Sequence, residues 1–371
     1  MNLYWYWPYL RQEELAIAAG AVQPGDRLVV DTTERVEEPV VSPIDGCVVR
    51  TNLAGVEPRR VGSTRWVVSR AGTYARRARA RSQAIREGGF DVAHMMYLNP
   101  FVDSVDLARL GRRIPLVSTV HDLVPHASRV PKPIEHRMLA RQYRHAGTLI
   151  TSHEVMRQRL VQEFDVDPAR IVVMSQDIPV MPPSPPRRPD QRPTALFFGT
   201  FRRNKGIEVL LDAIAQLDDD ADFVFAGRGE PDLEQLVIEA ATRDTRIIPE
   251  LGYASAARKD ELHAGADLIV LPYTSFASQS GVLYDAYSHA VPLVVADVGV
   301  LGVTVREEAT GWVVPPADAT ALAAAITGAL QDTSARTAAS EAQRAIAKTR
   351  TPELTGARIR RVYEDTIASW R

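Results

Sequence analysis

The sequence predicts an α/β protein with two Rossmann-like domains, and three observations support this fold class. The chain has 371 residues, which is more than one ordinary hydrophobic core accommodates. Apolar strand-like runs alternate with helix-like stretches in both halves, and this order produces parallel sheets. Seven prolines fall within residues 179–193, and proline neither donates to a sheet nor suits a helix interior. We therefore expect a domain at 1–180, an extended linker at 181–193 and a second domain at 194–353.

The first domain is predicted to contain a parallel sheet interleaved with helices. Its strands are expected at Leu3–Trp7, Arg27–Val30, Val92–Tyr97, Pro115–Val120, Leu149–Thr151 and Ile171–Met174. Helices are expected at Leu15–Ala19, Arg70–Arg86 and Asp106–Arg113. Short β-like pieces at Val40–Val41, Cys47–Val49 and Trp66–Val68 give no clear pattern. Ligands of parallel sheets bind beyond the carboxyl ends of the strands, and His121 falls at such an end.

The second domain repeats the alternation of strands and helices. Its strands are expected at Ala195–Phe198, Asp222–Ala226, Arg246–Ile248, Leu268–Leu271 and Leu293–Ala296. Helices are expected from Ile207, where apolar residues recur with helical spacing, and at Ala257–Ala264 and Val282–Ala290. The segment 354–371 comes after this sheet is complete and contains a last long helix, which we expect to pack back on the first domain.

The composition indicates a globular protein of a reducing compartment. No run of 18 apolar residues exists, so no membrane-spanning helix is predicted. The single cysteine, Cys47, cannot form an intrachain disulfide, and the first residues lack the features of a signal peptide. We therefore expect a cytoplasmic protein, and the excess of arginine over lysine indicates a bacterial source. The slightly basic first half and acidic second half are too weakly charged to argue for a nucleic-acid partner.

The basic helix predicted at Arg70–Arg86 leaves two interpretations open. Four of its arginines lie close together, at Arg76, Arg77, Arg79 and Arg81. Such a helix can lie on the inner face of an anionic membrane as a peripheral contact, or it can meet a phosphorylated acceptor. Its opposite face is rich in alanine rather than leucine or phenylalanine, which favours a helix that is simply solvated.

The stretch Phe197–Leu217 predicts an anion site in the second domain. An apolar strand ends in a turn at Gly199, and a basic loop with Arg202, Arg203 and Lys205 leads into a helix. The first backbone N–H groups of a helix have no partner within it, and the helix dipole adds partial positive charge there. With the cationic side chains they suit a phosphate or diphosphate. The alternative is a strand–helix joint whose basic side chains are only solvated.

A second helix opening of the same kind follows the predicted strand Leu268–Leu271. The small residues Ser280 and Gly281 open this helix, so a ligand can approach the backbone amides closely. Asp285 lies in the same helix, and a carboxylate beside a phosphate pocket suits the diol of a ribose. The alternative is that Asp285 is an ordinary exposed acid on a helix.

These stretches resemble the retaining glycosyltransferases of family four, which have the GT-B fold. The resemblance covers residues 195–316 well and the N-terminal half more loosely. FFGTFRRNKGIEVLLDAI is similar to the family's diphosphate loop, and FAGRG, which contains Gly227, to its next Gly-rich turn. LGYASAARKDELHAGADLIVLPY and SQSGVLYDAY…PLVVADVGVLGVTVREEATGWVVPPAD are similar to the segments that form the donor site. The combination and order of these blocks is specific, whereas any single block is weak.

The resemblance implies two domains that face each other across a cleft and a nucleoside-diphosphate sugar as co-substrate. Arg202 and Lys205 would hold the donor diphosphate, and Gly199 and Gly227 would lie in the turns beside it. No metal is expected to be required, because the two cations supply the charge. The acidic run Asp218–Asp220 follows a helix end and indicates a solvated turn, and no His/Cys set has zinc spacing.

The resemblance also assigns roles to residues at the second helix opening and in the first domain. Ser280, Gly281 and Val282 would supply amides to the diphosphate or sugar. Asp285 stands where the family has a glutamate that grips the ribose. His121, in the segment TVHD, matches the family's sugar-facing histidine. The alternative for His121 is a polar residue at a strand end.

The sequence departs from the family in two places. Ala277 stands where the family often has a motif glutamate, so contacts to the sugar hydroxyls would come from elsewhere, such as Gln279. The first strand–helix turn is usually Gly-rich but is aromatic here, which suggests acceptor stacking by Trp7 or Tyr9 with Arg11 near a charge. The alternative is that Trp7 and Tyr9 belong to the core.

The activity that the resemblance implies is transfer of a sugar to a hydroxyl group with retention of anomeric configuration. The acceptor would be a glycan, a lipid-linked molecule or a small molecule. Three alternatives remain open: a nucleotide-sugar epimerase or hydrolase of the same fold, a non-catalytic sugar-nucleotide binding protein, and a protein that docks on membranes through its basic helix.

Overall fold

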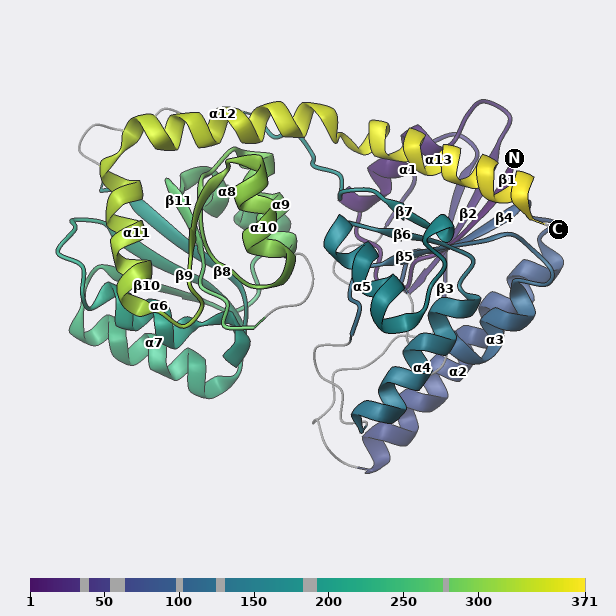
Figure 1. Ribbon diagram of the computed structural model, residues 1–371, viewed down its shortest axis with the longest axis horizontal. Coiled ribbons are helices and arrows are strands. Elements are labelled where there is room, and N and C mark those ends of the chain that lie inside the picture. Colours follow the sequence, from purple (N-terminus) through teal and green to yellow (C-terminus); the bar gives the residue numbers. More distant parts are fainter. Residues whose placement is uncertain are drawn as a thin grey trace. The chain divides into compact units, whose positions relative to one another are not determined.

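The structure is a computed structural model that describes residues 1–33, 40–53, 64–97, 103–124, 131–182, 192–275 and 280–370. These residues form two compact units, the first made of residues 1–176 with 352–371 and the second of residues 177–351 (Figure 1). Each unit is built on a parallel sheet with helices around it, so the predicted fold class of two α/β domains is confirmed. Residues 183–191 of the predicted linker lie outside the described residues.

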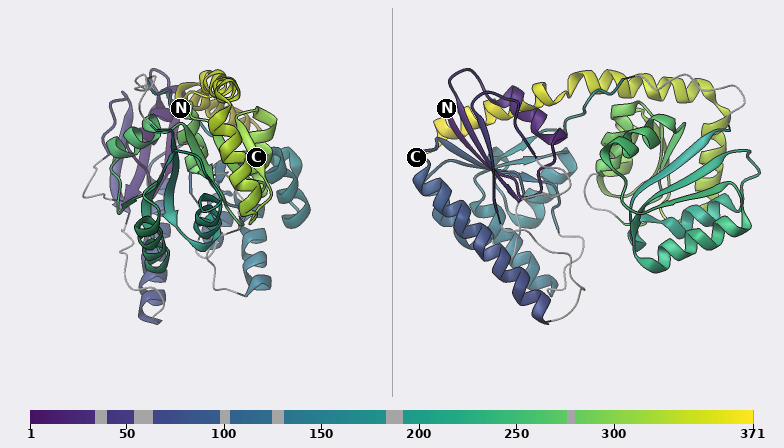
Figure 2. Two further views of the ribbon diagram at one scale, coloured as in Figure 1. Left: turned by 90° about the vertical axis from the view of Figure 1, so that its left-hand side faces the viewer. Right: turned by 180° about the vertical axis from the view of Figure 1, so that it is seen from behind.

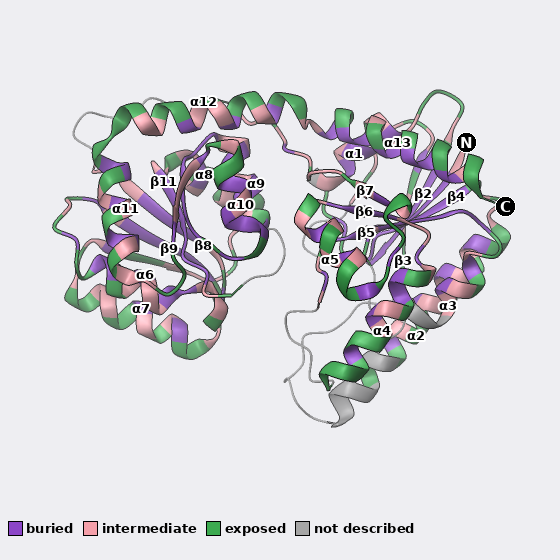
Figure 3. Cartoon of the chain, viewed as in Figure 1, coloured by how far each residue is buried: buried purple, intermediate pink, exposed green. Residues whose placement is uncertain are grey.

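The first unit contains a seven-stranded sheet in the order β3-β2-β1-β4-β5-β6-β7, and every neighbouring pair is parallel. The strands are β1 (Asn2–Tyr6), β2 (Arg27–Thr33), β3 (Cys47–Leu53), β4 (Val92–Met95), β5 (Leu116–Val120), β6 (Thr148–Thr151) and β7 (Ile171–Val173). All six strands predicted for this domain are present, and Cys47–Val49 lies in β3. Val40–Val41 lies in no strand. Most residues of β1, β4 and β5 are buried, as expected for a parallel sheet covered on both faces (Figure 3).

The first unit contains the three predicted helical segments and two longer helices, Lys132–His145 and Glu154–Phe164, that were not predicted. Its helical segments are η1 (Glu13–Ala16), α1 (Ile17–Ala21), α2 (Thr64–Glu87), α3 (Asp103–Leu110), α4 (Lys132–His145), α5 (Glu154–Phe164), η2 (Pro168–Arg170) and α13 (Pro352–Ser369). The β-like piece predicted at Trp66–Val68 is wrong, because these residues lie in α2. The aromatic and β-branched residues favour a strand locally, but the 24-residue helix is dominated by alanine and arginine, which favour helices.

The C-terminal helix α13 packs against α1 in the first unit, and two glycines allow the close approach. A Cβ atom on Gly20 would lie 1.8 Å from the carbonyl oxygen of Glu353, and one on Gly356 would lie 2.1 Å from that of Ile17. Tyr363 of α13 is fully buried in the core of this unit. The last helix of the chain therefore completes the first unit.

The second unit contains a six-stranded parallel sheet in the order β10-β9-β8-β11-β12-β13. The strands are β8 (Thr194–Phe201), β9 (Asp222–Gly229), β10 (Ile247–Leu251), β11 (Leu268–Leu271), β12 (Leu293–Ala296) and β13 (Gly311–Val314). The five predicted strands are present, and β13 is an addition that the sequence analysis missed. The helical segments are η3 (Arg203–Lys205), α6 (Ile207–Ile214), α7 (Pro231–Arg243), α8 (Ala256–Gly265), α9 (Gly281–His289), α10 (Gly299–Glu308), α11 (Ala319–Gln331) and α12 (Thr333–Thr349).

Helices cover both faces of this second sheet and enclose two hydrophobic cores. One core includes residues of α6, α7 and α11, and the other includes residues of α9, α10 and α12 (Figures 1 and 2). The predicted apolar stripe of α6 is buried, with Ile207, Leu210 and Ile214 each at most 2% exposed. Burial of side chains of this size contributes roughly 1.5–3 kcal/mol each. This packing fixes the basic loop that precedes α6.

Candidate active site

In the second unit the basic loop with Arg202, Arg203 and Lys205 packs against the segment that follows β11 and is hydrogen-bonded to it. Gly206 has a φ of +70° and comes directly before α6. A Cβ atom on Gly206 would lie 1.8 Å from the carbonyl oxygen of Pro272. The backbone N–H of Thr274 donates to the carbonyl of Asn204 at 3.0 Å, and the Asn204 amide donates to the carbonyl of Ser275 at 3.1 Å. The basic loop therefore lies against residues 272–275, which follow β11 in the direction of α9.

The three cations of this loop have different surroundings. Arg203 is held by the carboxylates of Glu208, Asp232 and Glu230. Arg202 is exposed, and its side chain makes no ion pair with any residue in the described part of the chain. Lys205 is half-buried, and its Nζ lies 3.7 Å from the centre of the Tyr273 ring. Arg202 and Lys205, the two cations that the resemblance assigns to the diphosphate, are thus the two that these carboxylates do not neutralise.

The two glycines of the neighbouring turns lie side by side at the carboxyl ends of β8 and β9. Gly199 and Gly227 are partners in the strand register, with φ values of +134° and +137°. A Cβ atom on Gly227 would lie 1.9 Å from the carbonyl oxygen of Gly199. One on Gly199 would lie 3.8 Å from Cγ2 of Val282, in the first turn of α9. The end of β8 therefore approaches the opening of α9.

The opening of α9 has an unusual cap. Ser280 takes the N-cap position, where a serine hydroxyl usually accepts from a backbone N–H of the first turn. Here the Ser280 side chain makes no such bond, and its Oγ is 2.9 Å from the Tyr273 hydroxyl instead. Gly281 is exposed and Val282 half-buried in the first turn. Gln279 and Ala277 lie outside the described residues.

Asp285 lies on α9 and is not an isolated exposed acid. Its Oδ1 accepts from Nζ of Lys259, on α8, at 2.8 Å, and 28% of its side chain is exposed. The fully buried His263 lies on the same helix as Lys259, and its Nδ1 is 2.8 Å from the Lys259 carbonyl. Sequence analysis missed Lys259 because its partner lies 26 residues away on another helix. The contact with Lys259 fixes the position of the Asp285 carboxylate.

In the first unit, His121 joins an aromatic cluster at the carboxyl edge of the sheet. His121 is exposed, its Nε2 is 2.9 Å from the Met96 carbonyl, and its ring stacks on Tyr97 at 6.5 Å. The Tyr97 ring meets that of Tyr9 edge-on at 5.0 Å. Arg77, on α2, donates to the Tyr9 hydroxyl at 3.3 Å. Strands β1, β4 and β5 and helix α2 thus bring His121 and Tyr9 to one place.

The other residues predicted at the first turn have different surroundings. Trp7 is 8% exposed and packs in the core near Trp5, which favours the alternative of a core residue over acceptor stacking. Tyr9 is 41% exposed. Arg11 forms an ion pair with Glu14 at 3.1 Å. Of the three residues, Tyr9 alone combines exposure with a place in the cluster around His121.

The interpretation of α2 as a simply solvated basic helix is wrong for two of its arginines. Arg77 and Arg81 are 1% and 0% exposed, whereas Arg76 and Arg79 are exposed. Arg81 bonds to Asp106 of α3 at 2.6 Å and lies 4.6 Å from the centre of the Tyr6 ring. A buried guanidinium requires such partners, and they come from elements far apart in the sequence.

Each half of the chain matches a family of known proteins. Residues 192–332 match the family Glycosyl transferases group 1, and residues 31–176 match Glycosyltransferase Family 4. The chain carries a Glycosyltransferase Family 4 domain followed by a group 1 glycosyl transferase domain. One relative of this glycosyltransferase is the D-inositol 3-phosphate glycosyltransferase of Corynebacterium glutamicum (strain R), 27% identical over 69% of this chain and 68% of the relative. Another curated relative, 32% identical, is matched over 38% of its own length.

Solved structures share the fold of this glycosyltransferase along its whole length. Sucrose-phosphate synthase from Thermosynechococcus elongatus has a TM-score of 0.76 and 18% identity, and the match covers 100% of both chains. Anabaena Alr3699/HepE, solved in complex with UDP-glucose, has a TM-score of 0.67 and 18% identity, again over 100% of both chains. These likenesses establish the GT-B fold of the glycosyltransferase.

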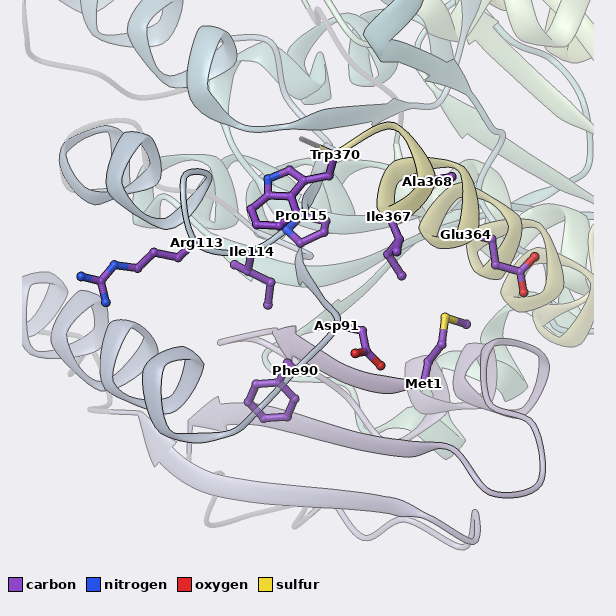
Figure 4. A pocket seen from close by; sticks show the side chains of 10 residues that line it. All are labelled: Met1, Phe90, Asp91, Arg113, Ile114, Pro115, Glu364, Ile367, Ala368 and Trp370. Carbon is purple, nitrogen blue, oxygen red and sulfur yellow. The ribbon is translucent and has the colours of Figure 1, made fainter.

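A cavity of about 540 Å³ lies at the opposite edge of the first sheet of the glycosyltransferase (Figure 4). Its walls include Phe90, Pro115 and Trp370, at the amino ends of β4 and β5 and the end of α13. Ligands of parallel sheets bind at the carboxyl ends instead. No predicted site residue lines this cavity, and we do not assign the active site to it.

Within the described ranges of the glycosyltransferase, no cluster of three or more His, Cys, Asp or Glu side chains is arranged to hold a metal ion. In the same residues, every helix is too short or too polar to cross a membrane.

His94 links α13 to the strands that carry the His121 cluster. Its burial leads us to expect that stability depends on pH. Its ring is fully buried, with Nδ1 2.7 Å from the Tyr363 hydroxyl and Nε2 2.8 Å from that of Thr119. Burial, and secondarily the neighbouring His121, lower the pKa of His94 to about 3. In the unfolded chain, His94 binds a proton below about pH 6.5, whereas in the folded chain it stays neutral down to about pH 3. The free energy of unfolding therefore falls as the pH drops from 6.5 toward 3.

We expect this loss to reach about 4 kcal/mol across that pH range. The measurement is denaturant unfolding at a series of pH values. His94→Gln should flatten the slope relative to the wild type, since glutamine does not titrate. His136→Gln, which replaces an exposed histidine, is the control for the loss of a histidine side chain. An equal slope in the wild type and His94→Gln would contradict the assignment.

Proposed function

We propose that this glycosyltransferase moves a sugar from a nucleoside-diphosphate sugar to a hydroxyl acceptor, with retention of anomeric configuration. The observation that carries the proposal is the junction of the basic loop with the α9 opening. Gly206 and Asn204 contact residues 272–275, and Gly199 lies beside Val282. This junction brings the loop that carries Arg202 and Lys205 next to the segment that leads into α9, and two cations beside a helix N-terminus suit two linked phosphates.

The chemistry that these groups would assist is charge separation at the anomeric carbon. The bond from that carbon to the diphosphate oxygen breaks, and the acceptor oxygen forms a new bond on the same face. The acceptor proton passes to the leaving diphosphate. Arg202, Lys205 and the amides of Gly281 and Val282 would stabilise the negative charge that develops on the diphosphate.

The donor's other parts have proposed contacts as well. Asp285, held by Lys259, would accept from the ribose hydroxyls. Gly227 lets the ends of β8 and β9 lie close together, and Gly199 lets the end of β8 lie beside Val282, where the nucleotide would bind. In the first unit, His121 would contact the donor sugar, and Tyr9 and Tyr97 would present rings to the acceptor. The acceptor class stays open between a glycan, a lipid-linked molecule and a small metabolite.

The test is a panel of UDP, GDP and dTDP sugars. Binding is measured by thermal shift, and transfer to a panel of acceptors is followed by mass spectrometry, with the product anomer assigned by NMR. We expect one base to be preferred and the α or β configuration of the donor to persist in the product. Hydrolysis or epimerisation of the donor alone would favour an enzyme of another class. Binding without turnover would favour a non-catalytic binding protein, and inversion would contradict retention.

A metal-free reaction is part of the proposal. Because Arg202 and Lys205 supply positive charge at the diphosphate, we expect the transfer rate in excess EDTA to stay within about twofold of the untreated rate. Initial rates with and without EDTA, and with added Mg²⁺ or Mn²⁺, provide the measurement. Activity that is abolished by EDTA and restored by one divalent ion would overturn this part.

A further inference from the structure

We propose that Tyr273 is a positioning residue that holds both sides of the diphosphate site, the ammonium of Lys205 and the hydroxyl of Ser280. The inference rests on the proposed function and adds a residue to which neither the resemblance nor the comparisons assign a role. Tyr273 lies two residues beyond β11, at the carboxyl edge of the second sheet. It is 1% exposed, so the surrounding structure fixes its ring.

The face of the Tyr273 ring fixes the Lys205 ammonium. Nζ lies 3.7 Å from the ring centre, within the range in which a cation is attracted to the electron-rich face of an aromatic ring. A lysine has four rotatable bonds and loses much freedom when its ammonium is held in one place. A fixed ring that already holds the ammonium reduces this loss on ligand binding. The ring does not neutralise the charge, as a carboxylate would.

The hydroxyl of Tyr273 acts on the other side of the site. It lies 2.9 Å from Oγ of Ser280, which is 3% exposed. Because Ser280 Oγ is engaged by the phenol, it does not cap the first turn of α9. Among the described residues, the amides of Gly281 and Val282 are then left for a ligand. When the phenol donates, the Ser280 hydroxyl keeps its own hydrogen for an anion. Burial raises the pKa of Tyr273 to about 12, so the phenol stays protonated at neutral pH.

The backbone around Tyr273 is fixed by the same junction. Pro272, just before it, meets Gly206, and Thr274, just after it, donates to the carbonyl of Asn204. The ring therefore has the basic loop on one side and the opening of α9 on the other. One side chain thus links two segments that are separated by about 75 residues in the sequence and that the proposed function requires to act together.

The experiment compares Tyr273→Phe and Tyr273→Leu with the wild type by isothermal titration calorimetry. The ligands are the nucleoside diphosphate that the wild type binds best and the monophosphate of the same base. We expect Tyr273→Phe, which keeps the ring and loses the hydroxyl, to bind the diphosphate about 3–10-fold more weakly. Tyr273→Leu loses both contacts and should bind it about 10–100-fold more weakly. Monophosphate affinity should change less than threefold in both variants.

The matched control is Tyr287→Phe. Tyr287 is equally buried, on α9, and its hydroxyl bonds to Glu308 and Thr310 away from the opening of that helix. This variant should lose thermal stability but keep the wild-type ratio of diphosphate to monophosphate affinity. If the ratio of diphosphate to monophosphate affinity falls in the Tyr273 variants and not in Tyr287→Phe, the positioning role is supported. Equal losses for both ligands would indicate a structural role and overturn the inference, as would unchanged affinity for both.

The proposed function can fail separately. If the wild type binds none of the nucleoside diphosphates, the proposed function fails before any variant is considered, and the inference on Tyr273 fails with it. If the wild type binds one of them and the Tyr273 variants match it, only the inference on Tyr273 is lost. Tyr273→Phe preserves shape and volume, so a result is available even if Tyr273→Leu does not fold.

Discussion

Replacement of Lys205 by alanine is expected to lower the transfer rate by about 10²–10³ while the second unit stays folded. Removal of one preorganised donor at a site of developing charge typically has an effect of this size. Lys205 is half-buried and held over the Tyr273 ring, so solvent or a neighbouring flexible cation does not easily replace it. The measurement is the initial rate of transfer at saturating donor, with circular dichroism and thermal unfolding as tests of the fold.

Arg203→Ala is the matched control for Lys205→Ala. Arg203 lies on the same loop, two residues earlier, and also carries a positive charge, but three carboxylates hold it. Its removal should change the transfer rate by less than about fivefold, because these carboxylates already neutralise its charge. An equal loss of transfer rate in the two variants would mean that the total positive charge of the loop assists the reaction, rather than an ammonium group held at a defined position. Wild-type rates in Lys205→Ala would remove Lys205 from the diphosphate site.

The regular elements follow from local patterns and were predictable. Apolar runs such as Leu268–Leu271 are buried on both faces of a sheet, and the helical spacing of Ile207, Leu210 and Ile214 gives α6 its buried stripe. Apolar runs and helical spacing each involve only a few neighbouring residues, so they can be read directly from the sequence. The strand-end rule likewise drew attention to His121. Tyr273 carries the same signal, because it follows the predicted strand Leu268–Leu271 by one proline.

The contacts that complete each site were not predictable, because they join residues far apart in the sequence. Arg77 and Arg81 resemble the exposed arginines beside them on α2, and only their packing against Tyr9, Tyr6 and Asp106 explains their burial. No local pattern distinguishes a buried arginine from an exposed one on a helix rich in alanine. Trp66–Val68 was mistaken for a β-like piece for a related reason, since the rest of α2 decides its conformation.

The glycines at the strand ends meet a requirement of the backbone. Gly227→Ala is therefore expected to reduce the free energy of unfolding by about 2–6 kcal/mol. Two costs combine. The φ of +137° is strained for a residue with a Cβ atom, at about 1–3 kcal/mol. The new Cβ atom would also lie 1.9 Å from the carbonyl oxygen of Gly199, so β8 and β9 must separate, at about 1–3 kcal/mol.

Gly252→Ala separates these two costs. Gly252 has a similar φ of +123°, but a Cβ atom there would have no other heavy atom within 4 Å. Its substitution should therefore reduce the free energy of unfolding by only about 1–3 kcal/mol, through backbone strain alone. Urea unfolding of both variants gives the comparison. Because displacement of Gly199 would also move β8 away from Val282, Gly227→Ala should weaken nucleotide binding in addition, whereas Gly252→Ala should not. Equal destabilisation by the two variants would show that the strand ends yield without cost and that Gly227 has no steric role.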